Sequence, residues 1–254
     1  MCEYLYRYVS FESFIGMIQR QSLTFVLPEV WIDPKESAPF QHLLESCDNI
    51  YEKLMLYVVH QKTYCQCWSR LAESDAMWQI YSYNNRAIRI RIKQCNVSHL
   101  DDVNVIPVEY SDDLMVQPEK GVKAYLAAIS RKRLAFNHEQ EVRLIKHYRF
   151  IGEDDLGKHI KALLAINDHP QKFELLENLY PGLSLDDQVY SIANLLNIGK
   201  GRKKTLEISF ADIPNFIDSI LVHPLAPDWY VDIVREYCAR NNALFDGRSQ
   251  LYDT

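Results

Sequence analysis

The sequence contains no run of about 18 apolar residues, and this lack excludes a membrane-spanning helix of ordinary length. Its first residues, Met1-Cys2-Glu3-Tyr4, lack the basic and then apolar segments of a secretory signal peptide. Internal repeats and low-complexity segments are absent as well. We therefore expect a cytoplasmic protein without a membrane partner.

The six cysteines include no Cys-x-x-Cys pair, and no pair of histidines at ligand spacing accompanies them. Cys65 and Cys67 are the two closest in the chain, but two thiols alone do not make a zinc site. Scattered cysteines of this kind are typical of reduced, mostly buried thiols. We expect no metal centre.

The charge balance excludes one class of protein and leaves a local exception. A net charge of −6 argues against a general nucleic-acid coat protein. Between residues 120 and 149, however, eight basic residues face only two acidic ones, Glu139 and Glu141. This basic band surrounds the two glutamates, so an anionic ligand is expected near them.

Hydrophobic periodicity indicates one α+β domain over residues 1–254, with a helical insertion at about 153–200. Ser10 is a good N-cap for the helix that follows the first strand. Strands are expected at 5–9, 23–27, 63–69, 87–92, 103–110, from 139 onward, 205–210 and 219–222. Helices are expected at 11–20, 41–60, about 75–81, 120–133 and 227–241. The strand at 87–92 alternates as if only one face were buried.

The segment Phe136–Lys146 carries two carboxylates at a spacing of two residues. Because strand side chains alternate, Glu139, Glu141 and Arg143 are expected on one face. Neighbouring carboxylates repel each other, and either a nearby cation or a shared substrate hydroxyl relieves the repulsion. The segment is therefore either a half-solvated strand neutralised by Arg143 or part of a site.

Three strand positions follow one another in a suggestive order: Arg7, then Ser69, then Glu139-Gln140-Glu141. This order resembles the R-S-E arrangement of the ADP-ribosyltransferase superfamily, whose members split NAD and transfer its ADP-ribose. Most of the chain also resembles an uncharacterised bacterial family with a Tyr-Arg-Tyr opening, an Asp-Pro-x-Glu loop, a Cys-x-Ser strand, a Trp-x-x-Tyr helix and a Glu-x-Glu-x-Arg strand. The chain departs from the transferase pattern where Arg70 and Leu71, instead of Thr and Ser, follow Ser69. The stretch 153–200 is also foreign to the minimal transferase fold.

The resemblance implies an ADP-ribosyltransferase-like fold, with split antiparallel β-sheets around an NAD cleft. Cleavage of the bond to nicotinamide passes through an oxocarbenium-like state, which a carboxylate stabilises. Glu141 is expected in that role, and Glu139 is expected to act on the acceptor. Ser69 is expected either to contact the ribose or to serve as a strand-end hydroxyl.

The resemblance also implies a set of NAD-binding residues. A diphosphate suits the planar fork of an arginine, so Arg7 is expected to bind it, with Tyr8 beside it. Trp78 and Tyr81 lie one turn apart and either stack on nicotinamide or pack in the core.

Three functions remain open from the sequence. The first is an NAD-dependent ADP-ribosyltransferase, a toxin or phage-defence effector that modifies an intracellular macromolecule and is restrained by an antitoxin, with or without a chaperone. The basic band favours a nucleic-acid acceptor, RNA or DNA, over protein. The second is a non-catalytic module that binds a nucleotide or a partner. The third is a metal-dependent nuclease with Asp33, Glu139 and Glu141 as magnesium ligands, whereas Glu36 is expected to be solvated.

Overall fold

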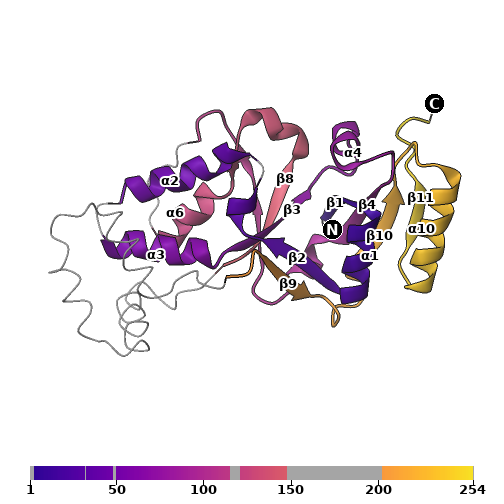
Figure 1. Cartoon of the computed structure of the whole chain (residues 1–254), viewed down its shortest axis with the longest axis horizontal. Helices are drawn as coiled ribbons and strands as arrows, with labels where there is room; N and C mark the ends of the chain where they lie inside the picture. The colour runs from indigo at the N-terminus through magenta and orange to yellow at the C-terminus, as the bar shows by residue number, and fades with distance from the viewer. Residues whose placement is uncertain (1–2, 32, 48–49, 115–120, 148–201, 254) are drawn as a thin grey trace.

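The fold is built on a nine-stranded, mixed and mostly antiparallel β-sheet with helices packed against it (Figure 1). The computed structural model describes residues 3–31, 33–47, 50–114, 121–147 and 202–253. The α+β class expected from the sequence is confirmed. The insertion expected at 153–200 lies outside the described residues.

The sheet has the order β11-β10-β4-β1-β3-β2-β9, with β8 paired to β3 and β5 paired to β8. Its strands are β1 (Tyr4–Ser10), β2 (Ser22–Val26), β3 (Tyr64–Ser69), β4 (Ala87–Lys93), β5 (Asn104–Pro107), β8 (Glu141–Lys146), β9 (Thr205–Ser209), β10 (Ile217–Val222) and β11 (Phe245–Arg248). A separate two-stranded sheet joins β6 (Glu109–Tyr110) to β7 (Arg131–Lys132). The helices are α1 (Phe11–Arg20), α2 (Ala38–Glu45), α3 (Ile50–Gln61), α4 (Asp75–Tyr81), α5 (Gln94–Val97), α6 (Gly121–Ala128) and α10 (Asp228–Arg240). Short 3-10 helices are η1 (Pro28–Val30), η2 (Pro34–Ser37) and η3 (Leu134–Glu139).

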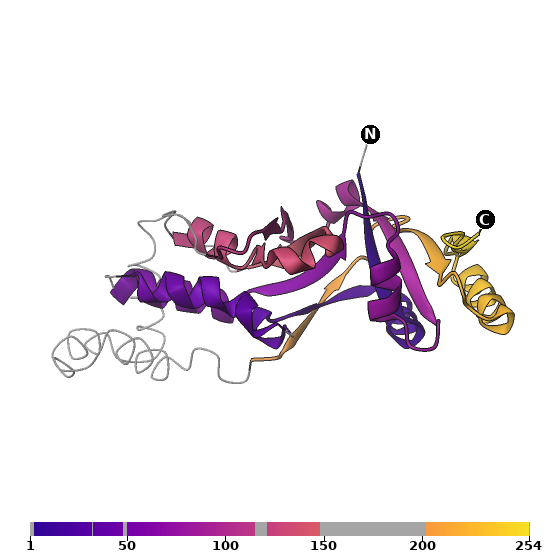
Figure 2. The same cartoon turned by 90° about the horizontal axis from the view of Figure 1, so that it is seen from above.

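The sheet is split where β1 meets β3. Strand β1 pairs with β4 along its whole length, and β3 pairs with β8 from Tyr64 to Ser69. Between β1 and β3, by contrast, the register holds a single pair, Tyr6 with Ser69. The strands on the two sides therefore diverge from one point. Figures 1 and 2 show the result: α2, α3 and α6 gather at one end of the molecule and α10 at the other.

Each face of the sheet has its own apolar core. On β8, Val142 and Leu144 join the large core that α1 and α10 cover, whereas Ile145 joins the core beneath α2, α3 and α6. A smaller cluster forms beneath α4, where Tyr8 packs against Met77 and Trp78. Apolar residues on both faces explain why the sheet is covered on both sides.

Several expected elements differ in the structure. The helix expected at 41–60 is two helices, since α2 ends at Glu45 and α3 begins at Ile50. The helix expected at 120–133 ends at Ala128, and a turn at Ile129 and Ser130 leads into β7. The second face of β4 is buried as well, because Ala87 packs in a cluster with Met77 and Trp78, and Arg89 donates to the carbonyl of Ala72. The short parallel edge strand β11 was not predicted, because Asp246 and Gly247 in it are poor strand formers.

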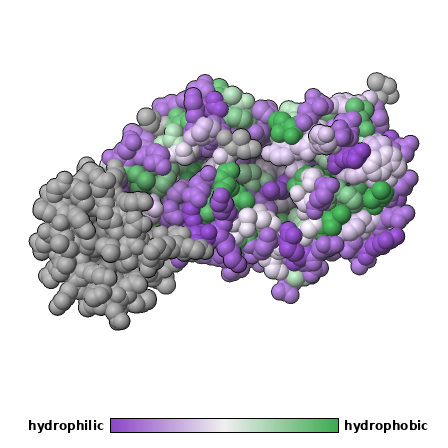
Figure 3. Space-filling model, viewed as in Figure 1, coloured by the Kyte–Doolittle hydropathy of each residue, from purple (hydrophilic) through white to green (hydrophobic). Residues whose placement is uncertain are grey.

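The surface in Figure 3 is mostly hydrophilic, and its hydrophobic residues are scattered. No helix within the described ranges is long and apolar enough to cross a bilayer. Cys65, Cys67 and Cys238 are free thiols, as expected. Cys95 is disulfide-bonded, so the expectation of reduced thiols is wrong for this residue.

Replacement of Ser10 tests how the sequence sets the start of α1. The Ser10 hydroxyl accepts a hydrogen bond of 3.2 Å from the backbone N–H of Ser13, as an N-cap does. Ser10→Ala should lower the free energy of unfolding by about 0.5–2 kcal/mol, measured by urea denaturation. Ser13→Ala keeps the capped N–H and should leave stability nearly unchanged. Equal losses in both variants would contradict the capping role.

Candidate functional site

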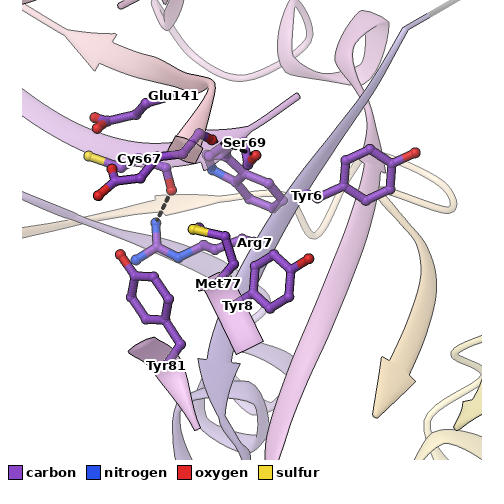
Figure 4. A pocket seen from close by; sticks show the side chains of 10 residues that line it. Tyr6, Arg7, Tyr8, Cys67, Ser69, Met77, Tyr81 and Glu141 are labelled. Carbon is purple, nitrogen blue, oxygen red and sulfur yellow. Dashed lines mark hydrogen bonds between the residues drawn. The ribbon is translucent and has the colours of Figure 1, made fainter. Parts of the chain in front are cut away.

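The strand register explains how three distant residues meet. Ser69 pairs with Tyr6 of β1 on one side and with Glu141 of β8 on the other. Arg7, the next residue of β1, therefore lies at the point where the sheet splits. Arg7, Ser69 and Glu141 line one small pocket of about 70 Å³, together with Glu139 and Tyr81 (Figure 4).

Arg7 bridges the opening between the diverging strands. Its guanidinium donates one hydrogen bond of 3.1 Å to the carbonyl of Cys67 on β3. Among the described residues, no carboxylate lies within ion-pair distance of it, and burial lowers its pKa from the ordinary value. Figure 4 shows the Tyr81 hydroxyl directed toward the same guanidinium. Arg7 thus keeps donors that are not engaged in ion pairs and face the pocket.

The Ser69 side chain holds the backbone together. Its hydroxyl donates to the carbonyl of Glu139 at 2.7 Å and accepts from the N–H of Leu71 at 3.0 Å. A second bond, from the N–H of Arg70 to the carbonyl of Gln140, fixes the same two segments. Of the two expected roles for Ser69, this geometry fits the strand-end hydroxyl.

The two aromatic candidates on α4 behave differently. Trp78 is fully buried in the cluster beneath α4, and its indole N–H donates to Glu73 at 2.9 Å. It cannot stack on nicotinamide, so that expectation is wrong and core packing is its role. Tyr81 does reach the small pocket. Tyr8 also lines this pocket, but its ring packs edge-on against Trp78, and its hydroxyl accepts from the N–H of Ser74.

Glu141 belongs to a closed ring of alternating charges. One carboxylate oxygen accepts from Nε of Arg143 at 2.7 Å, and the other accepts from Nζ of Lys132 at 2.8 Å. Glu36 closes the ring, at 2.6 Å from Arg143 and 3.4 Å from Lys132. We call these four residues the charged ring; Glu139 is attached to it through Lys132 at 2.7 Å.

The charged ring is buried, which corrects two expectations. The exposed fraction is 4% for Glu141, 7% for Glu36 and 0% for Arg143. Glu36 is therefore not solvated, and Glu141 and Arg143 do not lie on a half-solvated strand. Trp31 covers the guanidinium of Arg143 at 3.9 Å from the ring centroid. Buried charges of this kind need complete pairing, which the ring supplies.

Contrary to the expectation from the sequence, Glu139 does not lie on a strand. It ends η3, and Gln140 then takes a left-handed backbone conformation with φ of 42° before β8 begins at Glu141. This turn, rather than strand alternation, brings both carboxylates to the ammonium of Lys132. The N–H of Glu141 donates to the hydroxyl of Tyr110 at 2.6 Å, which fixes the start of β8.

Opposite pKa shifts separate the two glutamates. Burial alone would raise the pKa of Glu141, but the charges of Arg143 and Lys132 outweigh it and lower this pKa to about 2. For Glu139, burial and the nearby charge of Glu141 outweigh Lys132, and its pKa is raised. The pKa of Lys132 is raised by Glu141 and Glu36 in spite of burial. Such a divergent pair is typical of a fixed charge beside a proton acceptor.

Within the described part of the basic band, most of the cations are paired with carboxylates. Arg131 lies 3.3 Å from Glu109, Arg133 lies 3.0 Å from Asp33, and Lys146 lies 2.6 Å from Asp101. Asp33, Glu139 and Glu141 form no metal-binding group, and the described part of the chain holds no cluster of three or more such ligands. Lys132 and Arg133 occupy the positions beside these carboxylates that a magnesium ion would need.

A second, larger pocket of about 700 Å³ adjoins the small one. The two share Cys67, Tyr81, Glu139 and Glu141. The carboxylates thus form the boundary between the pockets. The other walls of the larger pocket include Trp31 and Phe136 with Asp33, Ile80, Lys132 and Arg133.

Acid unfolding tests the charged ring. The pKa of Glu141 falls from 4.5 to about 2 on folding, so this residue stabilises the fold by about 3 kcal/mol above pH 4.5. That contribution is lost as the pH falls from 4.5 through 2. The free energy of unfolding, measured by urea denaturation as a function of pH, should therefore lose this decrease between pH 4.5 and pH 2 in Glu141→Gln. The control is Glu109→Gln, whose side chain is 67% exposed, and its stability should depend on pH as that of the wild type does. If Glu141→Gln also shows the wild-type pH dependence, the charged ring does not stabilise the fold in this way.

No model of a known protein family, no curated protein sequence and no solved structure matches this chain.

Proposed function

We propose that the chain is an NAD-dependent ADP-ribosyltransferase. The observation that carries the proposal is the meeting of Arg7, Ser69 and Glu141, from three strands, in one pocket at the split of the sheet. A solvated strand would not bring an arginine with unengaged donors to face an ionised, buried carboxylate. NAD needs both groups, a cation for its diphosphate and an anion beside its reacting ribose.

Glu141 is suited to the bond-breaking step. Its pKa of about 2 keeps it charged at neutral pH, and the charged ring fixes its position. As the bond between nicotinamide and ribose breaks, the electron pair leaves with nicotinamide and positive charge develops on the ribose. A fixed carboxylate stabilises that charge without reorganisation.

Glu139 is suited to the second half of the reaction. It lies at the boundary of the two pockets, and its raised pKa makes it a better proton acceptor than an exposed glutamate. A lone pair of the acceptor forms the new bond to ribose, and the acceptor proton moves to Glu139. Lys132, shared with Glu141, holds the carboxylate in place.

Such an activity inside a cell would modify a macromolecule and require restraint, for example by an antitoxin. A non-catalytic binding module is the competing proposal, because the same pocket would also bind a nucleotide without cleaving it. Release of nicotinamide from NAD by the pure protein separates the two, since a binding module releases none.

Arg7→Lys tests the diphosphate contact. Lysine keeps the charge but loses the two parallel donors of guanidinium, so the affinity for NAD should fall about 10- to 100-fold. The measurement is NAD binding by calorimetry, with circular dichroism as a check that the fold persists.

A matched control for this variant is Arg91→Lys. Arg91 lies on β4 and pairs with Asp218 at 2.6 Å, outside both pockets. Its replacement should leave the affinity for NAD unchanged. If Arg7→Lys binds NAD as tightly as Arg91→Lys does, Arg7 holds something other than the diphosphate.

Substitution of the two glutamates should affect the two activities differently. Glu141→Gln should abolish both nicotinamide release and acceptor labelling, because the charge that stabilises the ribose cation is gone. Its fold should persist, since Glu36 and Glu139 still balance Lys132 and Arg143. Glu139→Gln should lower acceptor labelling by about two to four decades and nicotinamide release by less, because water can still trap the cation.

Both activities should be measured in one assay, with labelled NAD and a cell extract as the source of acceptors. Glu109→Gln is the control, since its side chain is largely exposed and lines neither pocket. Full activity in Glu141→Gln would remove the chain from the transferase class. Equal losses in both variants would show that the carboxylates act as one unit.

A further inference from the structure

The larger pocket is walled mainly by aromatic and aliphatic side chains. Trp31, Tyr81 and Phe136 supply three rings from three separate segments, and Val30 and Ile80 add apolar surface. Ile80 is 57% exposed and Tyr81 is 46% exposed. Trp31 and Phe136 are half-buried, and one face of Trp31 covers Arg143. The ring surface that remains around a cavity of this size offers stacking area for a flat ligand.

The charges of this pocket argue against a charged occupant. Asp33 is bonded by Arg133 at 3.1 Å and 3.0 Å, and Glu36, Glu139 and Glu141 are bonded by Lys132 and Arg143. A lysine or arginine side chain of a protein would find every carboxylate engaged and would meet two cations. An anionic group would meet the carboxylates themselves. An uncharged, planar ring fits these walls better than either.

Polar groups at the walls fit the edge of such a ring. The Arg133 side chain is 35% exposed, and its paired Asp33 supplies acceptors beside it. Nucleobases combine a stacking face with donors and acceptors at the edge.

We propose that the larger pocket binds an unpaired nucleobase of a single-stranded nucleic acid, stacked among Trp31, Tyr81 and Phe136, as the acceptor of the reaction. As an acceptor site it rests on the proposed transferase function. Glu139 at the shared boundary lies where a nucleophilic atom of the base would face the ribose in the small pocket. A nitrogen or oxygen of the base forms the bond to ribose, its proton passes to Glu139, and neutral nicotinamide leaves.

Binding is measured first, without NAD. The full chain is titrated into fluorescent single-stranded RNA and DNA oligonucleotides of mixed sequence, and the anisotropy is followed. A matched oligomer whose sugar-phosphate backbone carries no bases should bind far more weakly, because stacking rather than charge supplies the affinity. Equal binding of the base-free oligomer, or no binding of RNA and DNA, would overturn the proposal.

Phe136→Ala removes one ring of the pocket and should weaken oligonucleotide binding by about 5- to 150-fold, the usual effect of one lost stack. Leu134→Ala is the matched control, since Leu134 lies in the same 3-10 helix, is 50% exposed and does not line the pocket. Circular dichroism of both variants shows whether the fold is kept. The proposal fails if Phe136→Ala binds the oligonucleotides as tightly as Leu134→Ala does. If Phe136→Ala misfolds, Phe136→Leu is used in its place, and unaltered oligonucleotide binding by that variant also refutes the proposal.

A second measurement separates this proposal from the transferase function. The wild-type chain is incubated with labelled NAD, the two oligonucleotides and a mixture of unfolded proteins. Label on an oligonucleotide supports the proposal, and label on protein alone refutes it even though NAD is cleaved. If NAD is never cleaved, the transferase function and with it the acceptor role fail, while the binding titration still decides whether the pocket holds a base.

Discussion

The burial of Glu141 is the constraint on which the rest of this site depends. An isolated carboxylate at this depth would take up a proton, and the two cations beside it keep it charged. These cations come from different elements: Lys132 from β7 and Arg143 from β8, with Glu36 of η2 joining them. The loop before α2, the small sheet and the main sheet are therefore held together by one set of charges. Removing either cation would leave an excess of buried negative charge, which typically costs about 3–5 kcal/mol.

The place of the charged ring in the fold follows from the split of the sheet. Strands that pair along their length leave no room for a ligand between them, whereas β1 and β3 share only the pair of Tyr6 and Ser69. Beyond that pair, Arg7 spans the opening by its side chain, through the carbonyl of Cys67. The opening begins beside Glu141, because Glu141 of β8 pairs with Ser69 of β3. A cleft and a fixed carboxylate thus arise from the same three-strand junction.

The sequence predicts the parts of this arrangement that depend on local patterns. The cap at Ser10, the helix after it and most strands follow from propensity and periodicity. The order of Arg7, Ser69 and Glu141 was also visible, because the resemblance rests on short motifs. The burial of Glu36 was not, since it depends on Lys132 and Arg143, which lie 96 and 107 positions away along the chain. Trp78 was ambiguous because the same helical spacing serves a core and a pocket wall.

The left-handed residue between the two glutamates has a consequence for how this kind of site is recognised elsewhere. Gln140 reverses the local direction of the chain, and its amide is tied back to the carbonyl and the side chain of Asn137 at 2.8 Å each. The interval of two residues therefore does not determine how far apart the carboxylates lie. Other chains with longer or shorter intervals would form the same centre if a similar reversal preceded the strand. A search for related sites is better based on three-dimensional geometry than on the Glu-x-Glu pattern. The geometry to search for is one lysine that contacts two carboxylates, with an arginine that contacts one of the two.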